Sequence, residues 1–230
     1  FEEFKNMVIW KRGNLKGPFN KLVSYLDITF SDHGLFRLFW RSWGELPGKM
    51  YRCNQPYPFQ LSRDIKKYNI KSILNLRGER NCSSYFLEKE FCVKNKVSLY
   101  NFPVSSRDLP SKQKVLDFFK LLNKIQYPCI MHCKSGADRA GLASVLYMIY
   151  KQKKDVSVAI EQLNFKHLHI KYAKTGILDF FFNHAIKIEK NGHKEFIDWV
   201  KNDYNKDKLK NKFNYNGFFS FLVEKVLRRE

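Results

Sequence analysis

A cysteine and an arginine separated by five residues mark the part of this sequence best suited to chemistry. Cys133 is the candidate nucleophile and Arg139 the candidate anion ligand. The residues between them are Lys134, Ser135, Gly136, Ala137 and Asp138. A short apolar run ending at Met131 predicts a buried strand before this loop, and an apolar repeat with helical spacing over residues 142–149 predicts a helix after it. The candidate site therefore lies between a strand and a helix.

A loop of this kind at the start of a helix is suited to binding a phosphate dianion. Its backbone N–H groups can point inward, and the helix dipole adds partial positive charge at the same place. Gly136 lets the backbone bend without a Cβ in the way, and Arg139 can donate two N–H groups to two phosphoryl oxygens. The same field favours the thiolate of Cys133, which is the nucleophilic form. We therefore expect the nucleophile and the anion site within one short stretch of chain.

The residues around the loop resemble the H-C-x5-R signature of the cysteine-dependent protein tyrosine and dual-specificity phosphatases. His132 precedes the cysteine, and the strand, loop and helix follow in the same order. Upstream, Y-R-x-x-Q-P beginning at Tyr51 and I-L-N-L-R-G-E beginning at Ile73 are similar to bacterial and plant dual-specificity-like phosphatases. The resemblance covers about residues 46–190. It implies an α/β fold of three layers, in which helices flank a parallel-dominated central sheet.

The resemblance also implies a mechanism. Cys133 would attack phosphorus to form a phosphocysteine intermediate, while Arg139 and the loop residues 134–138 hold the phosphate. Asp108 corresponds to an acid, carried by a mobile loop in the family, that protonates the leaving oxygen. No metal and no cofactor are required, because the loop amides and the arginine supply the positive charge.

Two further residues are expected near the pocket. His132 immediately precedes the nucleophile, and Arg77 ends a predicted strand, where α/β folds place their sites. For Arg77, a surface ion pair with Glu79 is the alternative interpretation.

Two positions depart from the common family pattern. Ala140 follows the arginine, where Ser or Thr usually helps the thiolate to leave, so turnover of the intermediate is expected to be slow. A catalytically weak or inactive module that binds phosphate and docks on a membrane is therefore the alternative function.

Asp138 is the second departure. It gives the loop a C-x4-D-R form that is similar to phosphoinositide phosphatases, and it is an alternative to Asp108 as the acid. The substrates expected are phosphotyrosine or phosphoserine proteins, or a phospholipid or phosphoinositide.

The composition favours anionic partners without choosing among them. The 230 residues carry a formal net charge of +20, which attracts phosphorylated substrates, anionic membrane surfaces or nucleic acid. Richness in Lys, Asn, Phe and Tyr is also what an AT-biased coding sequence would give. Nucleic acid is not an expected partner, because no RNA-binding motif is recognised. No apolar run approaches the ~18 residues of a membrane-spanning helix.

The cysteines indicate a reducing compartment. The five of them are scattered without a C-x2-C pair or a regular framework, at Cys53, Cys82, Cys92, Cys129 and Cys133. We therefore expect a cytoplasmic location, with peripheral contact to a membrane left open. His167, His169 and Lys171 lie close together, but no carboxylate or cysteine beside them completes a metal site, and a surface loop is predicted.

Three segments are expected along the chain. Residues 1–45 form a basic, aromatic extension, predicted either to pack as helices on the domain or to lie at a membrane interface. Residues 46–190 form the phosphatase domain, and residues 191–230 a basic helical tail that contacts a partner or a membrane or packs back. Within the domain, strands are predicted at 50–53, 72–77 and 97–102, and helices at 59–68, 86–96, 112–126, 155–163 and 175–188.

Overall fold

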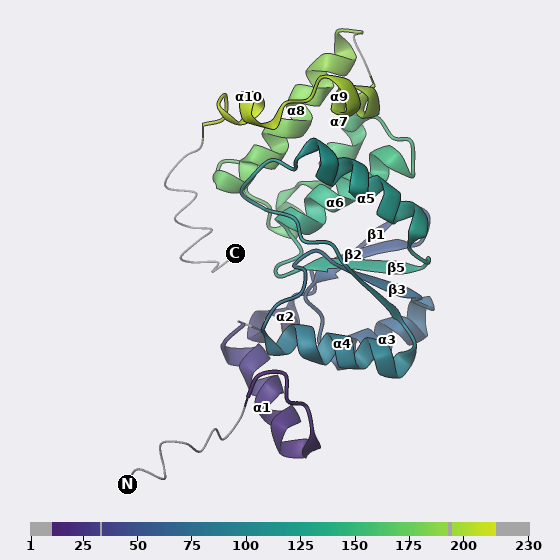
Figure 1. Cartoon of the computed structure of the whole chain (residues 1–230), viewed down its shortest axis with the longest axis vertical. Helices are drawn as coiled ribbons and strands as arrows, with labels where there is room; N and C mark the ends of the chain where they lie inside the picture. Colours follow the sequence, from purple (N-terminus) through teal and green to yellow (C-terminus); the bar gives the residue numbers. More distant parts are fainter. Residues whose placement is uncertain (1–10, 33, 193–194, 215–230) are drawn as a thin grey trace.

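The computed structural model describes residues 11–32, 34–192 and 195–214 (Figure 1). The strands in these residues are β1 (Gly44–Leu46), β2 (Met50–Asn54), β3 (Ser72–Asn75), β4 (Ser98–Asn101) and β5 (Cys129–Cys133). The α-helices in them are α1 (Gly17–Phe30), α2 (Leu35–Phe39), α3 (Pro58–Tyr68), α4 (Ser83–Asn95), α5 (Lys112–Lys124), α6 (Asp138–Tyr150), α7 (Val156–Ala159), α8 (Ile177–Lys190), α9 (Phe196–Asn202) and α10 (Lys206–Lys210). Short 3-10 turns lie at Ile160–Gln162, Phe165–His167 and Lys174–Gly176.

The strands form one sheet in the order β1-β2-β5-β3-β4. β5 pairs in parallel with β2 and β3, β3 pairs in parallel with β4, and β1 pairs antiparallel with β2. All five residues of β5 are buried, as expected for a parallel strand covered on both faces. Cys133 thus ends the central strand, at the edge of the sheet where parallel strands of an α/β fold present their sites.

Helices cover both faces of the sheet, which confirms the predicted three-layer α/β class (Figure 1). On the face of α3 and α4, Ile130 of β5 packs with Ile73 and Cys53. On the face of α5 and α6, Met131 packs in a separate core with Leu74. Successive strand residues point to opposite faces, so the alternation divides the apolar residues between two cores.

The described part of the C-terminal segment packs into the domain. Phe181 of α8 lies 5.9 Å from Phe196, 5.6 Å from Trp199 and 5.2 Å from Tyr204, measured between ring centroids. All four rings are buried, and they belong to the same core as β5 and α6. Of the two arrangements expected for residues 191–230, the described residues adopt the one that packs back. The apolar stretch at 218–223 lies outside the described residues.

The N-terminal segment is also tied to the domain. α1 packs along α4, where Ser83 Oγ donates to Asp27 Oδ2 at 2.7 Å and Lys21 Nζ lies 3.3 Å from Glu90. β1 was not predicted, because a strand of three residues is too short to leave a periodic pattern. β1 pairs with β2 and includes residues on both sides of position 45/46, where the sequence predicts the boundary between the N-terminal extension and the phosphatase domain.

Candidate active site

The loop from Cys133 to Arg139 folds back over the cysteine thiol. Cys133 is the last residue of β5 and Asp138 the first of α6, so residues 134–137 form the turn between them. The N–H of Gly136 donates to Cys133 Sγ at 3.2 Å, and the cysteine is only 2% exposed. Arg139, the second residue of α6, is also buried. The loop therefore turns at least one amide toward the sulfur, as a cup for an anion requires.

Arg52 and Gln55 donate hydrogen bonds to carbonyl groups of the loop. Arg52 Nη2 donates to the carbonyl oxygen of Gly136 at 2.8 Å and to that of Ala137 at 3.2 Å. The N–H of Gln55 donates to the carbonyl oxygen of Lys134 at 3.2 Å. In a trans peptide the C=O and the following N–H point in opposite directions. Anchoring these carbonyls therefore turns the amides of the same peptide units to the opposite side, where a phosphate would sit.

Arg52 is a structural residue of the site that the sequence did not reveal. It is fully buried in β2, and its Nη1 also donates to the carbonyl oxygen of Gln162 at 2.7 Å. Burial lowers its pKa to about 10, against the opposing effect of the nearby Cys133 and Asp138. The guanidinium therefore stays charged at neutral pH and adds positive potential behind the loop.

Gly136 occupies a position that only glycine fits. Its φ of +75° lies in the left-handed region, which residues with a Cβ rarely adopt. A Cβ built here would lie 2.7 Å from Ser42 Cβ and 2.8 Å from the backbone nitrogen of Asn54. Ser42 also donates through Oγ to the Gly136 carbonyl oxygen at 3.4 Å. The residues just before β1 thus form part of the floor under the loop.

A buried histidine joins two carboxylates at the end of the loop. His169 Nδ1 lies 2.8 Å from Asp138 Oδ1, and His169 Nε2 lies 2.6 Å from Asp179 Oδ2. Burial opposes protonation of the ring, but the two carboxylates outweigh it and raise the pKa of His169 to about 9. The imidazolium therefore ties the first residue of α6 to α8.

The prediction of a surface loop at residues 167–171 was wrong. His167 and His169 are both buried, because each has a polar partner that lies far away in the sequence. His167 Nδ1 lies 3.2 Å from Ser42 Oγ. Burial and the neighbouring charge of Arg52 lower the pKa of His167 to about 4, so this ring is neutral. Among the described residues, no group of three or more His, Cys, Asp or Glu side chains is arranged to hold a metal ion.

His132 and Arg77, the two candidate pocket residues, belong to one buried polar network, in which Gln55 donates to Glu88 at 3.2 Å and accepts from Arg77 at 3.1 Å. His132 is fully buried, and its Nε2 lies 2.8 Å from Glu88 Oε1 on α4. Arg77 makes two contacts of 3.0 Å with the carboxylate of Asp32 from the N-terminal segment. Lys134 of the loop reaches the same carboxylate, with its Nζ 3.8 Å from Asp32 Oδ1. Asp32 thus lies beside the loop and pairs with Arg77 and Lys134. The sequence analysis did not predict these contacts.

Asp108, the expected acid, is held by two lysines in this structure. Its carboxylate lies 2.6 Å from Lys206 Nζ and 3.0 Å from Lys210 Nζ, both on α10. Burial alone would raise the pKa of Asp108, but the hydrogen bonds and charges of the two lysines outweigh it and lower the pKa. The ion pairs therefore favour the ionised form, and proton donation requires the carboxylate to leave them.

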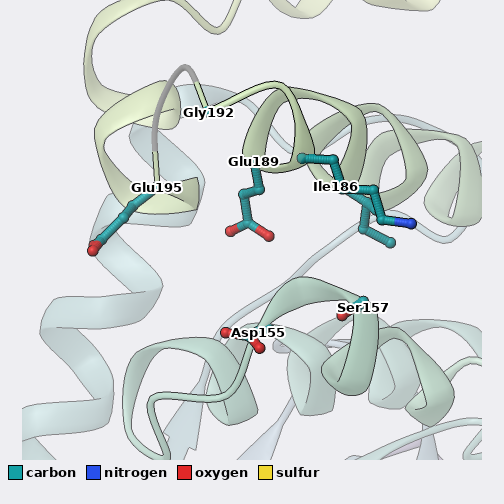
Figure 2. Close-up of a pocket in the computed structure, with 7 residues that line it drawn as sticks. Asp155, Ser157, Ile186, Glu189, Gly192 and Glu195 are labelled. Atoms are coloured by element: carbon teal, nitrogen blue, oxygen red, sulfur yellow. The ribbon is translucent and has the colours of Figure 1, made fainter.

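A cleft of about 520 Å³ lies away from this loop, between α7 and the end of α8 (Figure 2). Figure 2 shows the carboxylate of Glu189 facing Asp155 across the cleft. Burial raises the pKa of Glu189. Acidic side chains repel a phosphate group, so this cleft does not suit the substrates expected at Cys133.

A strand that ends in a buried cysteine, followed by a tight turn that directs an amide to the sulfur and then by a helix, is the arrangement of a cysteine-dependent phosphatase. Residues 62–175 match the family model described as DSP-PTPase phosphatase fused to NAD+ kinase. This segment, which contains the whole loop, belongs to the cysteine-dependent dual-specificity phosphatase family, and the chain is accordingly a phosphoric monoester hydrolase.

Solved structures are similar to this chain at low sequence identity. The catalytic domain of the PP-IP phosphatase SIW14 from S. cerevisiae matches with a TM-score of 0.50 and 19% identity, over 67% of this chain and 94% of that one. TpbA of P. aeruginosa matches with a TM-score of 0.46 and 16% identity, over 74% and 89% of the two chains. PTPMT1 matches with a TM-score of 0.47 and 19% identity, over 65% and 99%. No curated protein matches the sequence.

Because Gly136 is closely surrounded, adding a single methyl group at this residue is expected to distort the loop. Gly136→Ala is expected to lower phosphatase activity by roughly a hundredfold, because the loop must shift away from Ser42 and Asn54. Gly192→Ala is the matched control, since Gly192 has a φ of +69° but no heavy atom within 4 Å of an added Cβ. Steady-state kinetics on a soluble aryl phosphate compares the two variants. Equal activities would show that crowding at the loop has no catalytic effect.

The raised pKa of His169 predicts how stability depends on pH. The folded value of about 9 exceeds the unfolded value near ~6.5. The contribution of His169 is therefore fully present below ~6.5 and is lost as pH rises through about 9. Urea unfolding between these limits should show a wild-type advantage over His169→Gln that shrinks as pH rises. His184→Gln, a change in a histidine without this pair of carboxylates, is the control. Parallel pH profiles of wild type and His169→Gln would contradict the assignment.

Proposed function

We propose that this domain hydrolyses phosphomonoesters through a phosphocysteine intermediate at Cys133. The observation that carries the proposal is the hydrogen bond from the Gly136 N–H to Cys133 Sγ, which brings a backbone donor to the sulfur. The same donor stabilises a thiolate and can bind a phosphoryl oxygen beside it. Arg139 and the amides of residues 134–138 would hold the equatorial oxygens. The anchoring of the loop carbonyls by Arg52 supports this arrangement.

The proposed reaction has two steps. In the first, the Cys133 thiolate attacks phosphorus, the S–P bond forms, and the P–O bond to the leaving oxygen breaks. Asp108 gives a proton to that oxygen. In the second step, water attacks the phosphocysteine, the S–P bond breaks, and Asp108 takes the proton from the water. For the first step, Asp108 must separate from Lys206 and Lys210, since an ion-paired carboxylate has no proton to give.

The proposed substrate is a phosphorylated protein side chain or the phosphorylated headgroup of a lipid. A formal net charge of +20 supports an anionic partner. SIW14, the neighbour of the same fold, is described as a PP-IP phosphatase, which also favours a phosphate-rich substrate. The five cysteines carry no disulfide, which suits a reducing, cytoplasmic compartment. Peripheral contact with a membrane is part of the proposal.

Ala140 favours a second candidate function. It is fully buried in the core, and its side chain has no hydroxyl to assist departure of the thiolate. A domain that binds phosphate but releases it very slowly would follow if that assistance is essential. Measured phosphate release separates this candidate from the proposed enzyme.

Replacement of the nucleophile tests the proposal directly. Cys133→Ser is expected to lower phosphate release by about four orders of magnitude or more, while orthovanadate or phosphate still binds, because the loop amides remain. Cys82→Ser makes the same chemical change outside the loop, at a half-buried position, and should leave the rate unchanged. Colorimetric phosphate release and calorimetric binding give the two readouts. Full activity in Cys133→Ser would exclude the phosphocysteine, and binding without release in the wild type would favour the second candidate.

A leaving-group series distinguishes the two candidate acids. Asp108→Asn should reduce kcat by roughly 10²- to 10⁴-fold for alkyl phosphates, whose leaving oxygen needs a proton, and much less for nitrophenyl phosphate. Asp138→Asn is tested in the same series, and Asp117→Asn, an exposed carboxylate on α5, is the control. A leaving-group dependence in Asp138→Asn alone would transfer the role of proton donor to Asp138.

A further inference from the structure

One face of α1 presents large apolar side chains to solvent. Phe19 and Leu22 are each 58% exposed, Leu26 is 47% exposed and Phe30 is 69% exposed. Their spacing of three, four and four residues keeps them on one side of the helix. On another side, Ser24 and Ile28 are buried. α1 therefore has one face that packs on the domain and another that has no contact to cover it among the described residues.

α2 also exposes large apolar side chains. Leu35 is 54% exposed, Phe36 59% and Phe39 85%. Isolated exposed apolar residues are ordinary on a protein surface, but consecutive helices that both expose large apolar side chains indicate an interaction site. We call this surface the N-terminal apolar face. It consists of Phe19, Leu22, Leu26, Phe30, Leu35, Phe36 and Phe39.

Two residues next to the N-terminal apolar face in the sequence contact the loop that begins at Cys133. Asp32, in the connection between α1 and α2, has its Oδ1 3.8 Å from Lys134 Nζ. Ser42, three residues after Phe39, donates to the carbonyl oxygen of Gly136. Three residues of extended chain span at most about 10 Å. A surface bound at the α2 end of this face would therefore lie near the loop that begins at Cys133.

The charge of this segment identifies the kind of surface that fits it. Residues 11–43 contain six Lys and Arg residues and two Asp residues, a formal charge of 6 − 2 = +4. Four of these cations are in ion pairs within the domain, namely Arg12, Lys21, Arg37 and Arg41. Lys11 and Lys16 are exposed just before α1. Apolar side chains flanked by exposed cations suit the interface of a bilayer with anionic headgroups. Within the described residues, no helix has the length and apolarity needed to cross a bilayer, so contact through these residues would be with the membrane surface.

We infer that the N-terminal apolar face docks the phosphatase domain on an anionic membrane surface. The apolar side chains enter the headgroup region, and the cations contact the anionic lipids. The inference assigns the peripheral contact to α1 and α2, and it does not depend on turnover at Cys133. The docked domain would have its catalytic loop near phosphorylated headgroups in the same membrane.

Vesicle binding tests the inference. The full chain is sedimented with vesicles of phosphatidylcholine alone and with vesicles of equal parts phosphatidylcholine and phosphatidylglycerol. The wild type should bind the anionic vesicles more tightly, and added salt should weaken the binding. The double variant Leu22→Gln/Leu26→Gln should reduce the partition coefficient by roughly ten- to a hundredfold, because two buried leucine side chains are lost from the lipid phase. Glutamine keeps the helix propensity of these positions high.

Val158→Gln on α7 is the control, since Val158 is 46% exposed on a helix remote from α1 in Figure 1. It should bind vesicles like the wild type, and all three proteins should hydrolyse soluble nitrophenyl phosphate equally.

Equal vesicle binding by the wild type and the double variant would overturn the inference, as would no binding by the wild type. A wild-type dimer that becomes a monomer in the double variant, measured by light scattering without vesicles, would assign the face to a second copy and also overturn it. Vesicle binding without any hydrolysis would leave the inference standing and remove the catalytic proposal.

Discussion

The guanidinium of Arg52 holds the catalytic loop in its shape by binding the carbonyl oxygens of Gly136 and Ala137 from behind. Burying an unpaired guanidinium would be strongly unfavourable. Here the cost is offset by hydrogen bonds to three backbone carbonyls and by the nearby Cys133 and Asp138. The arrangement is therefore stable only while the loop carbonyls face Arg52. The amides are thereby directed to the other side before any substrate arrives, which is the preorganisation that electrostatic catalysis requires.

Other contacts fix the two ends of the loop. At its start, Cys133 belongs to a central strand that pairs on both sides with parallel neighbours. At its end, His169 joins Asp138 to Asp179 and so connects the first turn of α6 to α8. The imidazolium between two carboxylates also limits the negative charge that Asp138 brings close to the anion site. The negative charge of Asp138 is thus partly balanced within the loop's own surroundings.

The sequence predicted those parts of the fold and site that depend on neighbouring residues. The strand before the loop, the helix after it and the three strands upstream follow from apolar periodicity, and the structure confirms them. The contributions of Arg52 and His169 were missed, because their partners lie 84 and 31 residues away. The sequence predicted a surface loop at the histidines, because no carboxylate or cysteine beside them completes a metal site. Pairing over such distances has no local signal. The contacts of Ser42 and Asp32 were missed for the same reason, whereas β1 was missed because three residues are too short to leave a periodic pattern.

The contacts of the N-terminal segment affect how the chain can be divided for biochemistry. A fragment trimmed to residues 46–190 would correspond to the stretch that resembles the phosphatases. It would lack Ser42, which touches the loop, and two of the three residues of β1. It would also leave Arg77 and Lys134 without the carboxylate of Asp32, and the aromatic rings of α8 without Trp199 and Tyr204. If such a fragment were inactive, the loss of these contacts would be sufficient to explain it. The result would therefore not test the role of Cys133.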